Sequence, residues 1–181
     1  MLSCVCMAQK INKPYTSINT ALVFGDGGKR EGAFGLSGGY QFNKTKVGLG
    51  IGIDYHYYKT IPVFIELQRY LMQANKGLVL VANAGINIPS LKDDEKNDVF
   101  WPWGIPANNY KYKTGYFFES GLGYSFKTKN KTAITVGVLY SLKTTTQNYR
   151  ELVYDGSDVV THEREIKYNL NRTVLKVSVN L

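Results

Sequence analysis

The sequence predicts an all-β chain that forms a single antiparallel, up-and-down transmembrane β-barrel of about eight strands, with short turns at one end and long loops at the other. Three observations lead to this prediction. Apolar side chains alternate with small or polar ones, about eight segments show this alternation, and the connections between them are alternately short and long. No helical period of about 3.6 residues competes with the alternation.

The composition fits a folded chain and is compatible with a spanning barrel. The 181 residues are 13% aromatic and 20% charged, with a mean hydropathy of −0.23. This aromatic and β-branched content excludes disorder, and the sequence has no run of about 18 apolar residues that would form a spanning helix. The strands of a membrane barrel alternate, so their mean hydropathy stays low.

The net charge of +8 and the pI of about 9.3 raise the question of nucleic-acid binding. The lysines lie in the predicted hairpin turns, however, and no basic groove with interleaved aromatic residues is recognisable. We therefore expect no nucleic-acid partner.

Residues 1–9 precede the first patterned segment and are predicted to be the truncated end of a secretory signal peptide. They are apolar, contain both cysteines (Cys4 and Cys6) and end in the small residue Ala8 before Gln9. We expect the signal to begin upstream of Met1 and to be cleaved near Ala8–Gln9, which leaves residues 10–181 as a cysteine-free barrel domain. A disordered N-terminus and a lipoprotein cysteine at Cys4 are the alternatives.

The predicted strands follow one another in chain order, and each has one apolar face. In the clearest of them, the apolar series from Val47 to Tyr57 interleaves with glycines, Asp54 and His56. Most of the strands approach the length of about 9–11 residues that a tilted membrane strand needs. They cover residues 15–24, 34–42, 47–57, 63–68, 78–87, 117–126, 134–143 and 174–181.

The connections fall into two classes. Polar turn formers predict hairpin turns at 43–45, 73–76 and 127–131, whereas the other connections are 25–31, a brief one at 59–61, and two long loops at 89–109 and 147–166. Loops of about twenty residues are unusual in a compact soluble domain. They are typical of the outer end of a membrane barrel.

Charge follows the same division between the two ends. Eleven of the fourteen acidic residues lie in the predicted loops, and the remaining three, Asp54, Glu66 and Glu119, lie on the polar faces of strands. The short turns are assigned no acid and only lysines, namely Lys44, Lys46, Lys76, Lys127, Lys129 and Lys131. Two aromatic pairs precede these turns, and they predict the edge of a lipid-facing belt. The pairs are Tyr40 with Phe42 and Tyr124 with Phe126.

Together these features resemble the small eight-stranded outer-membrane barrels of the OmpA/OmpX type, over about residues 15–181. The best motif is the C-terminal strand from Thr173 to Leu181, although the family usually ends in an aromatic residue. The resemblance implies a Gram-negative outer-membrane location, contact with lipid and lipopolysaccharide, and recognition of that strand by the barrel-assembly machinery. The Ala8-Gln9 pair resembles a Bacteroidetes-like cleavage point. A structural or interaction role, and not an enzyme, is expected.

The polar strand faces predict a lumen filled by ion pairs, because buried carboxylates need cationic partners to offset their desolvation. Glu66 and Glu119 are expected to pair with cations drawn from Lys143, Arg172 and Lys176. A narrow gated pore or a proton path is the functional alternative. The predicted lumen network consists of Asp54, Glu66, Glu119, Lys143, Arg172 and Lys176.

Two further hypotheses belong to other classes of protein. Asp54 and His56 lie on one strand face, so the barrel could be an enzyme that acts on lipid or lipopolysaccharide. Alternatively, the chain could be a soluble, lipocalin-like carrier whose apolar faces point inward. No metal-ligand spacing, Rossmann glycine pattern or P-loop is present, so no cofactor or metal is expected.

The 89–109 loop contains an apolar, proline-bounded cluster within an acidic segment. Its aromatic residues could form a lid on the barrel rim or a contact surface for a protein partner. The candidate contact residues are Phe100, Trp101 and Trp103.

Overall fold

The structure is a computed structural model that describes residues 13–25, 30–56, 58–90, 111–128, 132–155 and 158–181. The predicted signal segment and the cluster of Phe100, Trp101 and Trp103 lie outside these residues. The strands are β1 (Lys13–Gly25), β2 (Arg30–Phe42), β3 (Thr45–Asp54), β4 (Thr60–Tyr70), β5 (Gly77–Pro89), β6 (Lys111–Lys113), β7 (Gly115–Lys127), β8 (Ala133–Asp155) and β9 (Asp158–Asn180).

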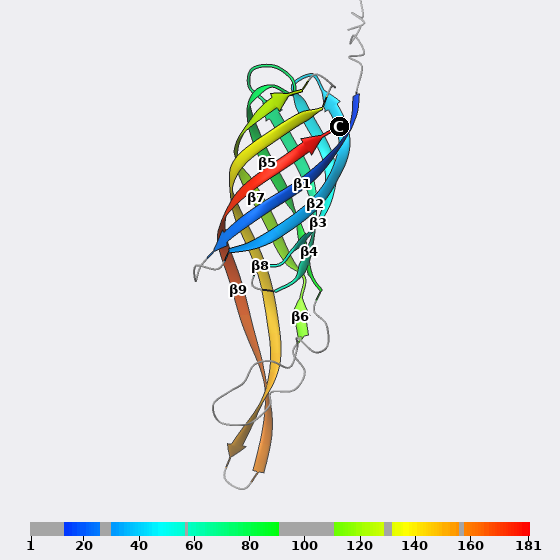
Figure 1. Cartoon of the computed structure of the whole chain (residues 1–181). Coiled ribbons are helices and arrows are strands. Elements are labelled where there is room, and N and C mark those ends of the chain that lie inside the picture. Colours follow the sequence, from blue (N-terminus) through cyan, green and yellow to red (C-terminus); the bar gives the residue numbers. More distant parts are fainter. Residues whose placement is uncertain (1–12, 26–29, 57, 91–110, 129–131, 156–157) are drawn as a thin grey trace, which may run out of the picture.

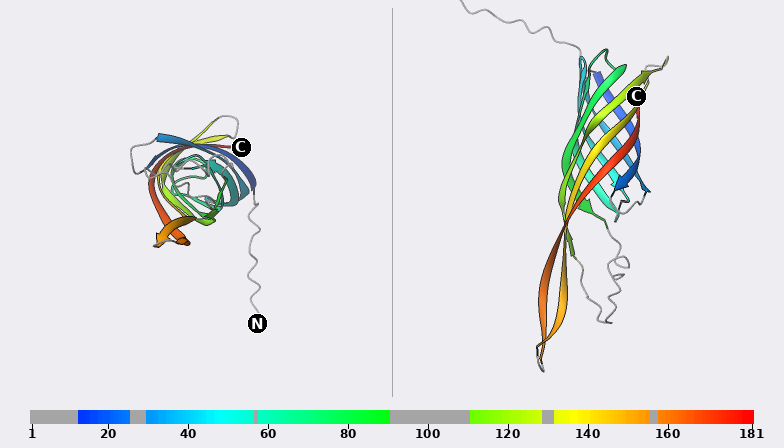
Figure 2. Two further views of the ribbon diagram at one scale, coloured as in Figure 1. Left: turned by 90° about the horizontal axis from the view of Figure 1, so that it is seen from below. Right: turned by 90° about the vertical axis from the view of Figure 1, so that its left-hand side faces the viewer.

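Eight of the described strands close into a ring. Each pairs antiparallel with the next, from β1 through β5 and then β7, β8 and β9, and β9 returns to pair with β1. The view along the axis shows this ring (Figure 2). The prediction of a single all-β, up-and-down barrel is confirmed, with the three-residue β6 as an addition that pairs with β8.

Burial alternates along the strands as the sequence predicts, and the apolar side chains point outward. On β3, Leu49 is 69% exposed and Ile51 is 52% exposed, whereas Asp54 on the opposite face is 3% exposed. The hypothesis of a lipocalin-like carrier required the reverse orientation and is therefore wrong. In its place the ring has an apolar outer wall and an interior in which polar side chains surround a smaller apolar cluster. That cluster consists of Val23, Tyr70, Val79, Val81, Leu139 and Val174.

Short turns gather at one end of the barrel, near the C-terminus and the start of β1 (Figure 1). Asn43 in the β2–β3 turn and Asn75 in the β4–β5 turn have positive φ angles of 57° and 60°. Asparagine tolerates this left-handed conformation better than most residues do. These turns therefore form where the sequence predicts hairpins.

At the opposite end, the predicted loop at 147–166 is wrong. β8 and β9 remain paired from Ala133↔Asn180 to Asp155↔Asp158, so the segment is a continuous antiparallel hairpin. β7 pairs with β8 only as far as Lys143, and β1 pairs with β9 only from Arg172 onward. Beyond those residues the two strands leave the barrel as a projecting ribbon, here called the β8–β9 ribbon (Figures 1 and 2).

Among the described residues, no helix is long and apolar enough to cross a membrane.

Candidate functional site

The candidate site is the polar lumen, and its first cluster lies toward the ribbon end of the barrel. Asp54, the last residue of β3, accepts a hydrogen bond from Arg172 of β9 and lies 3.5 Å from Lys143 Nζ of β8. Arg172 also donates to Ser141 Oγ at 2.7 Å. One buried carboxylate therefore faces two buried cations, and the structure brings together three of the predicted network residues.

The β3–β4 loop covers this cluster. The backbone carbonyl of His56 accepts a hydrogen bond from Lys143 Nζ at 3.1 Å, and the lysine nitrogen lies 4.9 Å from the centre of the Tyr58 ring. Tyr58 in turn packs against Tyr112 of β6, with ring centres 5.3 Å apart. Burial, and next the nearby Arg172, lower the pKa of His56 below its usual value, which favours the neutral imidazole.

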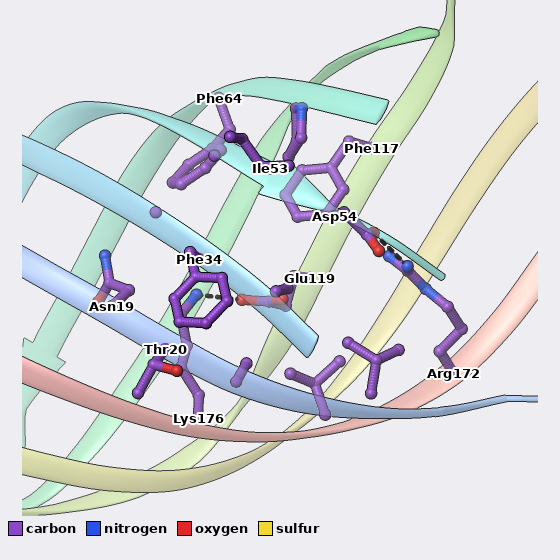
Figure 3. A pocket seen from close by; sticks show the side chains of 17 residues that line it. Asn19, Thr20, Phe34, Ile53, Asp54, Phe64, Phe117, Glu119, Arg172 and Lys176 are labelled. Atoms are coloured by element: carbon purple, nitrogen blue, oxygen red, sulfur yellow. Dashed lines mark hydrogen bonds and ion pairs between the residues drawn. The ribbon is translucent and has the colours of Figure 1, made fainter. Parts of the chain in front are cut away.

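The second cluster joins β5, β7 and β9 near the middle of the barrel. Glu119 accepts a hydrogen bond from Lys176 Nζ and another from Asn83 Nδ2 at 2.9 Å. Register pairing places Asn83 directly opposite Glu119 on the neighbouring strand. Lys176 extends to Glu119 from β9, which only β8 separates from β7 (Figure 3).

The prediction that Glu66 pairs with Lys143, Arg172 or Lys176 is wrong. Glu66 is 1% exposed, and its Oε1 accepts hydrogen bonds from the hydroxyl of Tyr15 at 3.0 Å and from Ser37 at 3.1 Å. Within the described part of the chain, Lys143, Arg172 and Lys176 form no ion pair with it. The three cations lie with Asp54 and Glu119 instead.

Sequence reasoning missed Lys46, which it assigned to the β2–β3 turn. In the structure Lys46 is 1% exposed, donates to Asn180 Oδ1 at 3.0 Å, and lies over the rings of Tyr15 and Tyr70 at 4.9 and 5.4 Å. The signal was present, because Lys46 has the same parity along the strand as Asp54 and therefore points inward. It closes the turn end of the lumen.

An aromatic pair lies between the clusters. The ring centres of Phe64 on β4 and Phe117 on β7 are 5.5 Å apart. Figure 3 shows both side chains among the residues that line the cavity. A Cβ atom at Gly50 of β3 would meet the Phe64 ring, so the glycine leaves the room that this ring needs. The cavity beside the pair has a volume of about 50 Å³, which is room for only a few water molecules.

The geometry does not form the dyad expected of a hydrolase. Asp54 Oδ1 accepts a hydrogen bond from the backbone N–H of His56 at 2.8 Å, and its other oxygen faces Arg172 and Lys143. The imidazole Nδ1 instead lies 3.8 Å from Glu31. Asp54 therefore does not orient the ring of His56 as the acid of a catalytic triad does.

The described residues include no group of three or more histidine, cysteine, aspartate or glutamate side chains placed to hold a metal ion.

Comparison with known proteins gives the fold its context. No family model and no curated protein sequence matches the chain. Several solved structures resemble it over most of their lengths at low sequence identity, three outer-membrane proteins among them. The outer membrane protein OprG from Pseudomonas aeruginosa has a TM-score of 0.56 at 14% identity, covering 93% of this chain and 95% of that one.

The Neisserial surface protein NspA has a TM-score of 0.58 at 12% identity, covering 94% of this chain and 98% of that one. The outer membrane protein AlkL has a TM-score of 0.53 at 13% identity, with coverages of 92% and 88%. These similarities do not single out the OmpA/OmpX type. The chain has the fold of the small eight-stranded outer-membrane β-barrels.

Proposed function

We propose that this protein is a bacterial outer-membrane β-barrel with a structural or interaction role, which holds the β8–β9 ribbon outside the membrane. Its outward faces support insertion into lipid. Five successive outward positions of β8 are apolar and exposed, which corresponds to a band about 20–25 Å high for a tilted strand. The band consists of Ile134, Val136, Val138, Tyr140 and Leu142.

The observation that carries this proposal is the filled lumen. The barrel contains two ion-paired clusters, the Phe64–Phe117 pair and the Lys46 closure, and the cavity between them is small. An eight-stranded barrel is just narrow enough for its own side chains to fill the interior, as they do here. Contacts with other molecules are therefore assigned to the parts outside the wall, of which the β8–β9 ribbon is the longest described segment.

The proposed orientation places the short turns on the periplasmic side and the ribbon at the cell surface, as in other outer-membrane barrels. In this orientation the ribbon and the loops beside it meet the lipopolysaccharide leaflet and any protein partner. The OmpA/OmpX type remains the more specific proposal for the family.

We also propose that the C-terminal strand is the contact for the barrel-assembly machinery. Its outward residues Leu175 and Val177 are exposed, and β9 is the strand that closes the ring by pairing with β1.

Cysteine labelling tests the location and the orientation together. A membrane-impermeant maleimide should label His162→Cys, on the ribbon, in intact cells. It should label Gln73→Cys, in the β4–β5 turn, only after the outer membrane has been permeabilised. Both side chains are exposed and polar, so the two variants are matched.

The parent chain without an added cysteine controls for Cys4 and Cys6. Heat-modifiable gel mobility of the membrane fraction checks that each variant is a folded barrel. If Gln73→Cys were labelled in intact cells and His162→Cys were not, the short turns would lie at the cell surface and the proposed orientation would be wrong. Recovery of the chain in the soluble fraction would refute the membrane location.

A further inference from the structure

Arg69 is a charged residue on the mostly apolar outer wall of the barrel. Within the barrel part of the described strands, charged side chains on the outward face occur at Arg30, at the ribbon end, and at Arg69, near the turn end. Arg30 lies over the ring of Phe24 at 5.9 Å. Arg69 has no aromatic contact of this kind among the described residues.

The surroundings of Arg69 are apolar on three sides. Leu67 and Leu71, two residues before and after it on the same face, are 45% and 48% exposed. Register pairing places the exposed Leu80 of β5 beside it on one side and Thr45 of β3 on the other. An arginine in this position lies among side chains that the proposed membrane would cover.

The protein provides Arg69 with a hydrogen-bond acceptor but no counter-charge. The guanidinium donates to the hydroxyl of Thr45 at 2.5 Å, and no described carboxylate lies within ion-pair distance of it. An outward arginine costs about 2–4 kcal/mol at the bilayer midplane and about 0–1 kcal/mol near the interface. Arg69 therefore belongs at the level of the lipid headgroups.

The position of Phe42 supports the placement of Arg69 at the level of the lipid headgroups. Phe42 pairs with Thr45, which pairs with Arg69, so the three residues form one row across β2, β3 and β4. Aromatic residues are enriched at the membrane interface. The phosphate group of a lipid would meet a guanidinium here, while its acyl chains would lie against Leu67 and Leu80.

We propose that Arg69, with Thr45 beside it, binds the phosphate of an anionic phospholipid in the leaflet at the short-turn end. The planar guanidinium offers two parallel N–H donors, which match two phosphate oxygens and form strong, charge-assisted hydrogen bonds. The short turns mark the periplasmic leaflet, so a phospholipid is the proposed ligand rather than lipopolysaccharide. This inference rests on the proposed membrane location.

The test uses the full chain reconstituted in nanodiscs of phosphatidylcholine with and without phosphatidylglycerol. Native mass spectrometry should detect phosphatidylglycerol that remains bound to the wild-type protein. Arg69→Gln should lower this retention about tenfold, the ratio that corresponds to 1.4 kcal/mol. The matched control Arg30→Gln removes one outward charge at the other end and should leave the retention unchanged.

Arg69→Lys keeps the charge without the planar fork and should give an intermediate retention, which also provides a second variant. Equal retention by the wild type and Arg69→Gln would overturn the proposal, as would an equal loss in Arg30→Gln. Preferential, Arg69-dependent retention of lipid A in a parallel nanodisc would overturn the choice of phospholipid. Failure of the wild type to insert into any nanodisc would instead refute the proposed function.

Discussion

Asp54 is the residue on which two buried cations depend. Its carboxylate faces both Arg172 and Lys143, and all three side chains are shielded from solvent. Removal of one partner from a buried ion pair leaves an uncompensated charge, which costs about 3–5 kcal/mol. Asp54→Asn is therefore expected to lower the free energy of unfolding by about that amount, measured by urea titration of the barrel in detergent or lipid.

The control is Glu165→Gln, which removes the carboxylate of an exposed ion pair with Lys113 at 3.3 Å. Exposed pairs contribute about 0–1 kcal/mol, so this variant should unfold close to the wild type. Similar losses in the two variants would contradict a desolvated lumen. A double-mutant cycle between Asp54 and Arg172 would isolate their coupling.

Glu66 gives a second prediction at this scale. Its carboxylate is buried and accepts hydrogen bonds from Tyr15 and Ser37. Glu66→Gln would replace two charge-assisted hydrogen bonds by weaker neutral ones and would put an amide group in the buried place of the second oxygen. It should therefore destabilise the barrel more than Glu165→Gln does, in the same urea titration. Equal midpoints for the two variants would place Glu66 in contact with bulk water.

A substitution at Ile51 tests whether the outer wall faces lipid. It is 52% exposed and lies in the middle of the outward series on β3. Ile51→Arg should cost about 2–4 kcal/mol in a lipid bilayer, because an arginine at the midplane is desolvated. Val136→Arg on β8 should behave similarly, whereas Asn169→Arg, outward and exposed on the ribbon part of β9, should not.

At the scale of elements, the β8–β9 ribbon should be dispensable for folding. The barrel pairs of β8 end at Lys143 and those of β9 begin at Arg172, so the ribbon lies beyond the closed ring. An Asn-Gly turn in place of residues 149–164 would join Asn148 to Glu165, which already face each other. The barrel should retain its heat-modifiable mobility and should unfold within about 0.5 kcal/mol of the wild type.

The apolar cluster of the predicted 89–109 loop is a separate prediction from the sequence. Trp101→Ala with Trp103→Ala should leave the barrel folded and abolish co-purification of a protein partner, because rigid aromatic residues dominate many interfaces. If the double variant fails to fold, the cluster is a structural lid.

The barrel strands were predictable from the sequence because each has one face in a polar lumen and the other on an apolar wall. This contrast produces the alternation seen from Val47 to Asp54. The β8–β9 ribbon was not predictable, because no alternation marks residues 147–166. Where the structure describes its side chains near the tip, over residues 162–167, both strand faces are exposed. Its strands are assigned from backbone pairing alone.

The residues that point into the lumen were predictable from the alternation of side chains along each strand. Which of these residues would pair with each other was not predictable. Strand parity places Asp54, Glu66 and Glu119 inside the barrel, whereas pairing depends on how strands on opposite sides of the ring are staggered. Arg172 and Asp54, for example, belong to strands that are not neighbours. A single sequence does not specify how the strands are staggered around the ring. Glu66 was therefore given the wrong partners, and Lys46 was assigned to a turn instead of the lumen.

At the scale of the whole molecule, the filled lumen predicts an electrically silent barrel. An ion that crossed the barrel would have to pass Lys46, the Phe64–Phe117 pair and the Asp54 cluster, and the cavity beside the pair holds only about 50 Å³. In planar bilayers the wild-type protein should therefore show no sustained conductance steps, with a porin as the positive control. Phe64→Ala with Phe117→Ala should admit water and produce measurable leakage. Steady steps in the wild type that disappear in Glu119→Gln would instead identify the ion pairs as the lining of a narrow pore.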